Sequence, residues 1–256
     1  FAVTPSNWVA AEADGVQPLF WAALDEADAR DEQHDFHFAS VDQSRYTVMF
    51  FTDLHLTNSS EKRDLDHYRS IALASISDEA AQASARGPVY SLNLGDLSHD
   101  LYWYQYDFDV SSAKRFLEQN GFPTLLYSIP GNHDNDPYVA DDFESENPWR
   151  ENLGPTYYSF DIGDIHYIQL DNTLFTNTGG AQGTVGKLDY TEGLTADQLR
   201  WLEADLQRVP AGKTVFVGMH IQFTNRYRIA DGKPVSIAIP VRLTGNAEGV
   251  KVGGKL

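Results

Sequence analysis

The chain has 256 residues, 42% of them hydrophobic, which is enough for one large domain or for one domain with an appendage. Its formal net charge of −18 argues against a nucleic-acid backbone as the main partner, because phosphate polyanions require a basic footprint. The chain has no cysteine, which excludes disulfides, thiolate metal sites and a cysteine nucleophile.

The sequence leaves the cellular compartment open. No apolar run is long enough to span a bilayer, and no signal peptide is recognisable. The first residue is Phe1 rather than methionine, so we expect a chain that is processed, excised or incomplete. A protein without cysteine is compatible with the cytosol, the periplasm and the exterior, and we expect a periplasmic or secreted location. The oligomeric state is not predicted.

Regular structure is predicted from residue 46 onward, and we expect residues 1–45 to form an N-terminal appendage or packing arm. Residues 46–52 are β-branched and aromatic without alternation, which predicts a strand buried on both faces. A helix over 61–86 follows, closed by Gly87-Pro88. The next predicted elements are a strand at 89–94, a helix at 111–120 and a strand at 124–129.

The second half of the chain begins with a predicted hairpin, in which Gly163-Asp164 joins strands at 157–162 and 165–171. Thr195-Ala-Asp-Gln198 is a capping box that starts a helix, and another buried strand covers 214–218. The order βαβαβ, hairpin, αβ predicts an α/β fold with a layered core and mixed sheets. We expect the main domain to cover 46–244, and the glycine-rich residues 245–256 to form a flexible tail.

Four short polar motifs each follow an apolar run: Asp53-Leu-His55, Gly95-Asp96, Gly131-Asn-His-Asp134 and Met219-His220. In an open α/β fold, loops beyond the carboxyl ends of the strands form the ligand crevice. Carboxylate, amide and imidazole donors without thiolates favour zinc, manganese or iron. Asp96 is the best candidate to bridge two ions, which in such sites lie about 3.5–4 Å apart.

Each motif alone has a structural explanation. Asp-x-His is commonly a turn or a surface pair, Gly-Asp is commonly a turn, and a lone histidine such as His220 is often packed in a core. The whole series in this order, each motif after a strand, favours a metal site. His166, in the middle of a predicted strand, is expected to be a packed or hydrogen-bonded core residue.

The series resembles the calcineurin-like metallophosphoesterases, whose pattern is Asp-x-His, Gly-Asp, Gly-Asn-His-Asp/Glu, a single His and then Gly-His-x-His. The resemblance covers residues 46–224. It implies a layered sandwich of two mixed β-sheets flanked by helices, with two divalent metal ions (Mn, Fe or Zn). Asp53, His55 and Asp96 would serve one ion, and Asp96, Asn132 and His220 the other.

The resemblance also implies catalytic roles. His133 would face the phosphate as general acid or transition-state donor, and Asp134 would orient His133. We also expect Asp100 to lie behind the ligands and to orient a ligating histidine. The expected activity is hydrolysis of small phosphomonoesters or phosphodiesters through a metal-bridging hydroxide.

The family's Gly-His-x-His motif is absent, since no histidine follows His220. Three explanations stand: the sequence stops or has a gap before that strand, Asn246 and Glu248 take the two histidine places, or the site has lost its metals and chemistry. Both substitute side chains can ligate hard metals. The rival function is therefore a catalytically degenerate binding or interaction module on the same fold.

Two segments bear on the substrate. Residues 102–106 contain four aromatic side chains, which could stack on a leaving group or pack as a hydrophobic lid. Residues 136–147 are acidic and would repel a polyanion, so we expect a small phosphoester as substrate and no nucleic acid.

Overall fold

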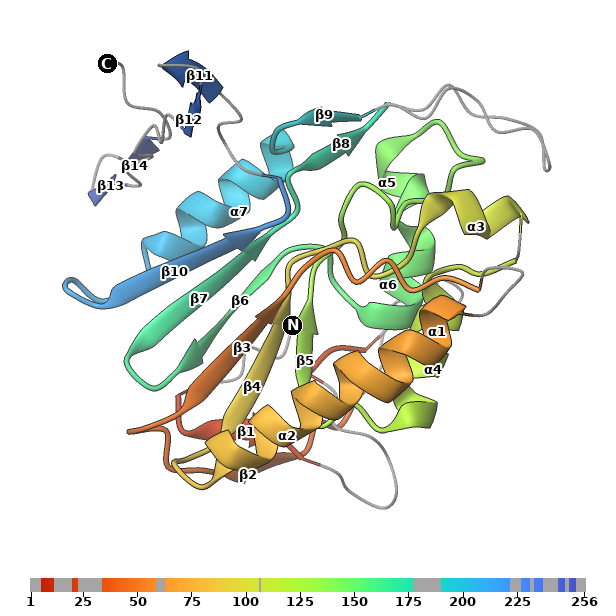
Figure 1. Ribbon diagram of the computed structural model, residues 1–256. Coiled ribbons are helices and arrows are strands. Elements are labelled where there is room, and N and C mark those ends of the chain that lie inside the picture. Colours follow the sequence, from red (N-terminus) through yellow and green to blue (C-terminus); the bar gives the residue numbers. More distant parts are fainter. Residues whose placement is uncertain are drawn as a thin grey trace.

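Two three-stranded sheets pack face to face in the computed structural model, with helices outside them (Figure 1). Within the described residues no helix is both long and apolar enough to cross a membrane. The structure describes residues 6–11, 20–22, 34–58, 63–105, 107–176, 190–221, 227–230, 233–236, 244–246 and 249–251.

The first sheet has the order β3-β4-β5, formed by Thr47–Phe51, Val89–Asn93 and Leu126–Ser128. All three strands are parallel. Their carboxyl ends therefore meet at one edge of the sheet, where the chain continues into three of the four polar motifs.

The second sheet has the order β10-β7-β6, formed by Thr214–Met219, Ile165–Leu170 and Tyr158–Ile162. β6 and β7 form the predicted hairpin, with Gly163 at φ 54° in its turn. β10 is parallel to β7, so His220 emerges at the carboxyl end of this sheet.

Three hydrophobic layers hold the molecule together. Between the sheets, the ring of Phe160 stacks on Tyr127 at 4.1 Å and on Tyr167 at 5.4 Å. Outside the first sheet, a cluster that includes Phe116 and Trp149 packs the helices. Outside the second sheet, Leu202 and its neighbours cover β7 and β10.

The helices that cover the first sheet are α1 (Arg63–His67), a π-helical turn (Tyr68–Ala72), α2 (Leu73–Ser84), α4 (Val110–Asn120) and α6 (Asn147–Leu153). The second sheet is covered by α7 (Ala196–Leu206).

The predicted layered α/β sandwich is confirmed, but β3 differs from expectation. Among the described residues β3 pairs only with β4, and the side chain of Phe50 is 47% exposed. The apolar run without alternation is therefore an edge strand in this protein. Its apolar residue Phe50 packs against Phe216 at the open side of the sandwich. Short elements were not predicted from the sequence: α3 (Asp100–Gln105), α5 (Asp142–Ser145), β8 (Thr173–Phe175) and β9 (Tyr190–Glu192).

Described parts of the N-terminal 45 residues pack on the domain. β1 (Trp8–Ala10) pairs with β2 (Phe38–Ser40), and Phe20 packs between Tyr127 and Tyr158. Of the two expectations, appendage or packing arm, these contacts favour the packing arm.

The described C-terminal segments form two short hairpins, and the second overlaps the predicted tail of residues 245–256. β11 (Tyr227–Ala230) pairs with β12 (Lys233–Ser236), and β13 (Thr244–Asn246) pairs with β14 (Gly249–Lys251). The predicted tail is therefore wrong for residues 245–246 and 249–251, because glycine-rich composition hides a strand that pairs locally. Asn246 lies in β13, whereas Glu248 lies outside the described residues.

Candidate metal centre

The four polar motifs converge at the carboxyl ends of β3, β4, β5 and β10, around the carboxylate of Asp96. Asp96 Oδ2 lies 3.6 Å from His55 Nε2 and 3.3 Å from His220 Nε2. His55 Nε2 is 3.7 Å from Asp53 Oδ1, and His220 Nε2 is 3.0 Å from Asn132 Oδ1. All five predicted metal ligands therefore belong to one cluster.

Potential ligand atoms at this site fall into three groups among the described residues, two of which share Asp96, while the third consists of His99, Asp100 and His133. Asp53, Asp96 and His220 each offer one atom within 4.8 Å of the others, and so do His55, Asp96 and His133. Asp96 is common to both groups, as expected of a bridging ligand. The second group contains His133, which was predicted to face the phosphate, so the geometry also permits His133 to reach an ion.

Backbone strain holds the ligands of the first two motifs. Asp53, His55 and Asp96 have positive φ angles of 54°, 44° and 54°. Such left-handed conformations are unfavourable for residues with a Cβ and persist only when the surroundings enforce them. Here Asp53 N donates to Gly95 O at 3.0 Å and His55 N donates to Asp96 O at 2.9 Å, which ties the two loops together.

Two glycines provide space for the cluster. A Cβ on Gly95 would lie 2.7 Å from Nδ1 of His220, and a Cβ on Gly131 would lie 2.2 Å from Oδ1 of Asp96. Neither position can accept a side chain unless the ligands move. The glycines of the Gly-Asp and Gly-Asn motifs are thus required by the close approach of the loops.

The donor set fits divalent cations. Nδ1 of His55 is buried without a hydrogen-bond partner, and the Asp96 side chain is only 3% exposed. Burial opposes ionisation of Asp96, but hydrogen bonds from His220 and from the His133 backbone, with their charges, lower its pKa below the ordinary value. A buried carboxylate kept ionised among imidazoles is what a cation requires. The Asp53 side chain is 53% exposed, so the cluster opens to solvent on that side.

Hydrogen bonds outside the cluster orient its histidines. His220 Nδ1 lies 2.9 Å from the carbonyl oxygen of Leu94, which directs Nε2 toward Asp96. The backbone next to His220 is held by Asn172, whose side chain accepts from Ile221 N at 3.0 Å and donates to Ile221 O. Asn172 lies two residues after the end of β7, and sequence reasoning gave it no role.

Asp100, and not Asp134, is the carboxylate that contacts the ring of His133. His133 Nδ1 lies 2.7 Å from Asp100 Oδ1. Asp134 is fully buried and accepts hydrogen bonds from the backbone of Leu97, Ser98 and Gly131, which join its own loop to the loop after β4. The expected role of Asp134 in orienting His133 is corrected accordingly, because its carboxylate is occupied by these amides.

His99 is a further histidine of the site that sequence reasoning left without a role. Its ring centroid lies 4.8 Å from that of His133 and 5.1 Å from that of His55, and its Nδ1 is 3.3 Å from Asp100 Oδ1. Burial, and then the charge of His133, lower the pKa of His99. The sequence feature that could have pointed to His99 is its position three residues after Asp96. Many ordinary turns have the same spacing, so this feature does not single out a site residue.

The aromatic segment 102–106 was interpreted either as a stacking surface for a leaving group or as a hydrophobic lid. The structure bears on these two interpretations only at Trp103. Trp103 is buried in the outer core, and its Nε1 donates to Ser98 Oγ at 3.2 Å. This residue packs as a core element and does not stack on a ligand. The side chains of Tyr102, Tyr104 and Tyr106 lie outside the described part.

The convergence of carboxylate, amide and imidazole donors at the strand ends of an α/β sandwich defines a metal-binding protein of the two-sheet layered class. The model of the calcineurin-like phosphoesterase family matches residues 46–242. The chain therefore belongs to the calcineurin-like phosphoesterase family.

Two other comparisons give further matches. A dimetal phosphatase from Danio rerio is similar over 72% of this chain and 72% of its own, with 14% sequence identity and a TM-score of 0.44. A stretch of 52 residues is 44% identical to the large ribosomal subunit protein bL25 in two strains of Bacteroides fragilis. That stretch is 20% of this chain, and the chain spans about a quarter (24%) of the length of those curated relatives.

Proposed function

We propose that this protein hydrolyses small phosphomonoesters or phosphodiesters with two divalent metal ions at the Asp96 cluster. The gathering of Asp53, His55, Asn132 and His220, from three separate motifs, around the buried carboxylate of Asp96 is the observation that carries the proposal. When bound, the ions would acidify a water molecule and neutralise charge on the phosphoryl oxygens.

The ligands divide between the two ions around Asp96 in this proposal. Asp53 and His55, from the loop after β3, would hold one ion. Asn132 and His220, which lie 3.0 Å apart at the ends of β5 and β10, would hold the other. Manganese, iron and zinc suit these oxygen and nitrogen donors.

His133 is the proposed general acid. Its side chain is 27% exposed at the mouth of the cluster, and its Nδ1 is bound to Asp100. With Nδ1 engaged, Nε2 is free to donate a proton to the departing oxygen of the substrate. Desolvation disfavours the charged ring, but the hydrogen bond to Asp100 and the nearby carboxylates raise its pKa. The hydrogen bond to Asp100 thus favours the protonated ring that a general acid requires.

The test compares two variants of the purified protein. In His133→Ala we expect turnover of p-nitrophenyl phosphate and bis-p-nitrophenyl phosphate to fall by about 10²–10⁴-fold with bound metal retained, since general acids contribute on that scale. Asp96→Asn should lose metal and activity together. Metal content is measured by mass spectrometry after loading with manganese or zinc, and His67→Ala is the control, because His67 is exposed on α1.

Two outcomes would contradict these assignments. Loss of metal in His133→Ala would make His133 a ligand instead of an acid. A wild-type chain with neither bound metal nor turnover would support the degenerate binding module, which the missing Gly-His-x-His motif keeps as the alternative.

A further inference from the structure

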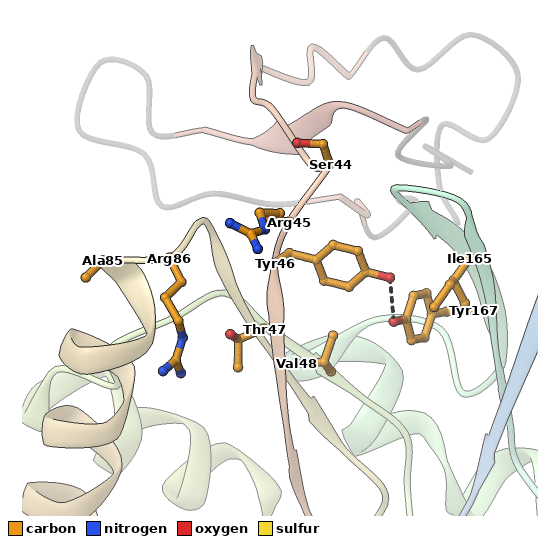
Figure 2. Close-up of a pocket in the computed structure, with 9 residues that line it drawn as sticks. All are labelled: Ser44, Arg45, Tyr46, Thr47, Val48, Ala85, Arg86, Ile165 and Tyr167. Carbon is orange, nitrogen blue, oxygen red and sulfur yellow. Dashed lines mark hydrogen bonds between the residues drawn. The ribbon is translucent and has the colours of Figure 1, made fainter.

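A cavity of about 810 Å³ lies beside the start of β3 (Figure 2), whereas the candidate metal centre follows the end of that strand. It is lined by residues 44–48 at the start of β3, by Ala85 and Arg86 at the end of α2, and by Ile165 and Tyr167 of β7. Asp53 of the metal cluster lies six residue positions beyond Thr47, which is about 20 Å of extended chain. Its volume is in the range of small-molecule sites, roughly 300–1,000 Å³.

The cavity is basic in an acidic protein. Its lining contains Arg45 and Arg86 and no carboxylate, although the whole chain carries a net charge of −18. Neither arginine forms an ion pair with another residue in the part of the chain that the structure describes. Both arginines are exposed, so each guanidinium group is accessible to an anion at this cavity.

The two sides of β3 give the cavity two different walls. Arg45, Thr47 and Arg86 lie on one side of the strand in Figure 2, whereas Tyr46 and Val48 lie on the other, as strand alternation requires. On that second side Tyr46 Oη lies 3.0 Å from Tyr167 Oη, and Ile165 adds aliphatic surface. One wall is thus cationic, and the other is aromatic and aliphatic with hydroxyl groups.

We propose that this cavity is a second ligand site that binds a small organic phosphate, independently of the reaction at the metal centre. The phosphoryl group would lie against Arg45 and Arg86, because guanidinium groups match phosphate oxygens with paired N–H donors. The organic part would lie against Tyr46 and Val48. A dianion suits this site better than a monocarboxylate, since two cations face it without any neighbouring carboxylate in the lining.

The test uses the full chain, freed of metal by chelation, with phenylphosphonate as a probe that cannot be hydrolysed. Nitrogen-15 spectra of the arginine Nε–H groups, assigned with the single variants Arg45→Gln and Arg86→Gln, report on this site directly. We expect both signals to shift and saturate. In calorimetry the double variant should weaken this binding by about tenfold or more, as loss of charge-assisted contacts does. Arg208→Gln, an exposed arginine after α7, is the matched control and should bind as the wild type does.

Three results would overturn the proposal. The first is that the Arg45 and Arg86 signals do not shift at millimolar phenylphosphonate. The second is that the double variant binds with wild-type affinity. The third is that inorganic phosphate binds as tightly as the aryl phosphonate, which would mean that the organic part of the ligand is not recognised. Thermal unfolding of each variant checks that the fold is kept. Because no metal is present and no turnover is measured, failure here is distinct from failure of the hydrolase proposal.

Discussion

Neighbouring aspartates of the site have different properties because their partners differ. Asp96 faces imidazole rings, which lower its pKa. Asp134 is deeper, and burial together with the charge of Asp96 raises its pKa to about 6, although amides of Ser98, Gly131 and Leu97 oppose the rise. The sequence marks both as aspartates after a strand, and only the structure separates the ligand from the carboxylate that ties two loops.

Replacing Asp100 by asparagine tests whether this residue positions His133. We expect kcat to fall by about 10–100-fold, the usual effect of removing a partner behind an active-site histidine, with KM and metal content unchanged. Steady-state kinetics and metal analysis measure this. Asp134→Asn should instead lower metal content, because its carboxylate joins the loops after β4 and β5. The reverse pattern would return the orienting role to Asp134.

A buried carboxyl pair, Glu146 and Asp171, makes the second prediction at this scale. Burial, and then its hydrogen bond to Asp171, raise the pKa of Glu146 well above the ordinary value, despite the ion pair with Arg150 at 2.6 Å. The raised pKa means that the folded protein retains a proton that the unfolded chain loses above about pH 4.5. The free energy of unfolding should therefore fall as the pH rises from there toward neutrality.

Glu146→Gln keeps the shape and donor of the protonated acid, so we expect a more stable protein at pH 7 and a weaker pH dependence. Urea unfolding between pH 4.5 and 8 measures the difference, which can reach about 1.4 kcal/mol per pH unit. Glu144→Gln, on the exposed side of α5, is the control. A destabilised Glu146→Gln variant at neutral pH would show that the ion pair with Arg150 dominates.

At the scale of elements, His166 joins three of them. Its Nδ1 lies 2.8 Å from Asp161 Oδ1 of β6, and its Nε2 lies 2.8 Å from Asp205 Oδ2 of α7. Burial alone would lower the pKa of His166, but these two carboxylates raise it. The prediction of a hydrogen-bonded core histidine is confirmed, and the structure adds that the ring fastens α7 to the second sheet.

We expect His166→Gln to destabilise the protein more at pH 6 than at pH 9. A histidine whose pKa is raised by folding contributes its full stability below about pH 6.5, and that contribution is lost as the pH rises through the folded value. Thermal unfolding at both pH values measures the effect, with His67→Gln on exposed α1 as control. Equal destabilisation at the two pH values would mean that the ring acts through packing alone.

Which elements could be predicted depends on how much local signal they carry. The predicted start of α7 is confirmed because Thr195 caps it by accepting from Gln198 N at 3.2 Å. The predicted end of α4 at Asn120 is confirmed too, and Gly121 with φ 72° follows as its C-cap. In contrast, α5 covers one turn and β8 three residues, too short for a hydrophobic period. Their positions depend on tertiary contacts, such as the hydrogen bond from Phe175 N to Asp142.

For the whole molecule, the order of motifs predicted which residues meet but not how they are oriented. Parallel strand ends bring Asp53, Asp96 and Asn132 to one edge, and this follows from the βαβαβ pattern. The positive φ angles at three ligands and the hydrogen bond from His133 to Asp100 depend on contacts between loops. No local pattern encodes such contacts, so these features required the structure.

Metal binding should stabilise the whole fold. An ion bound only by the folded state at about 100 times its dissociation constant adds about 2.7 kcal/mol, which for a chain of this size raises the melting temperature by about 5–10 °C. Scanning calorimetry with manganese or zinc, reversed by a chelator, measures the shift. Asp96→Asn should abolish it. An equal shift in that variant would place the stabilising ion elsewhere.

The left-handed backbone at Asp53, His55 and Asp96 means that the conformation of the loops, and not the metal, fixes the arrangement of these ligands. Each such residue costs on the order of 1–3 kcal/mol, and bonds between the two loops offset that cost when the chain folds. An arriving cation would then meet donors that are already aimed, so little conformational entropy would remain to be lost on binding. Selection for rigidly held ligands would in this way retain aspartate and histidine at positions where glycine would make the loop more stable.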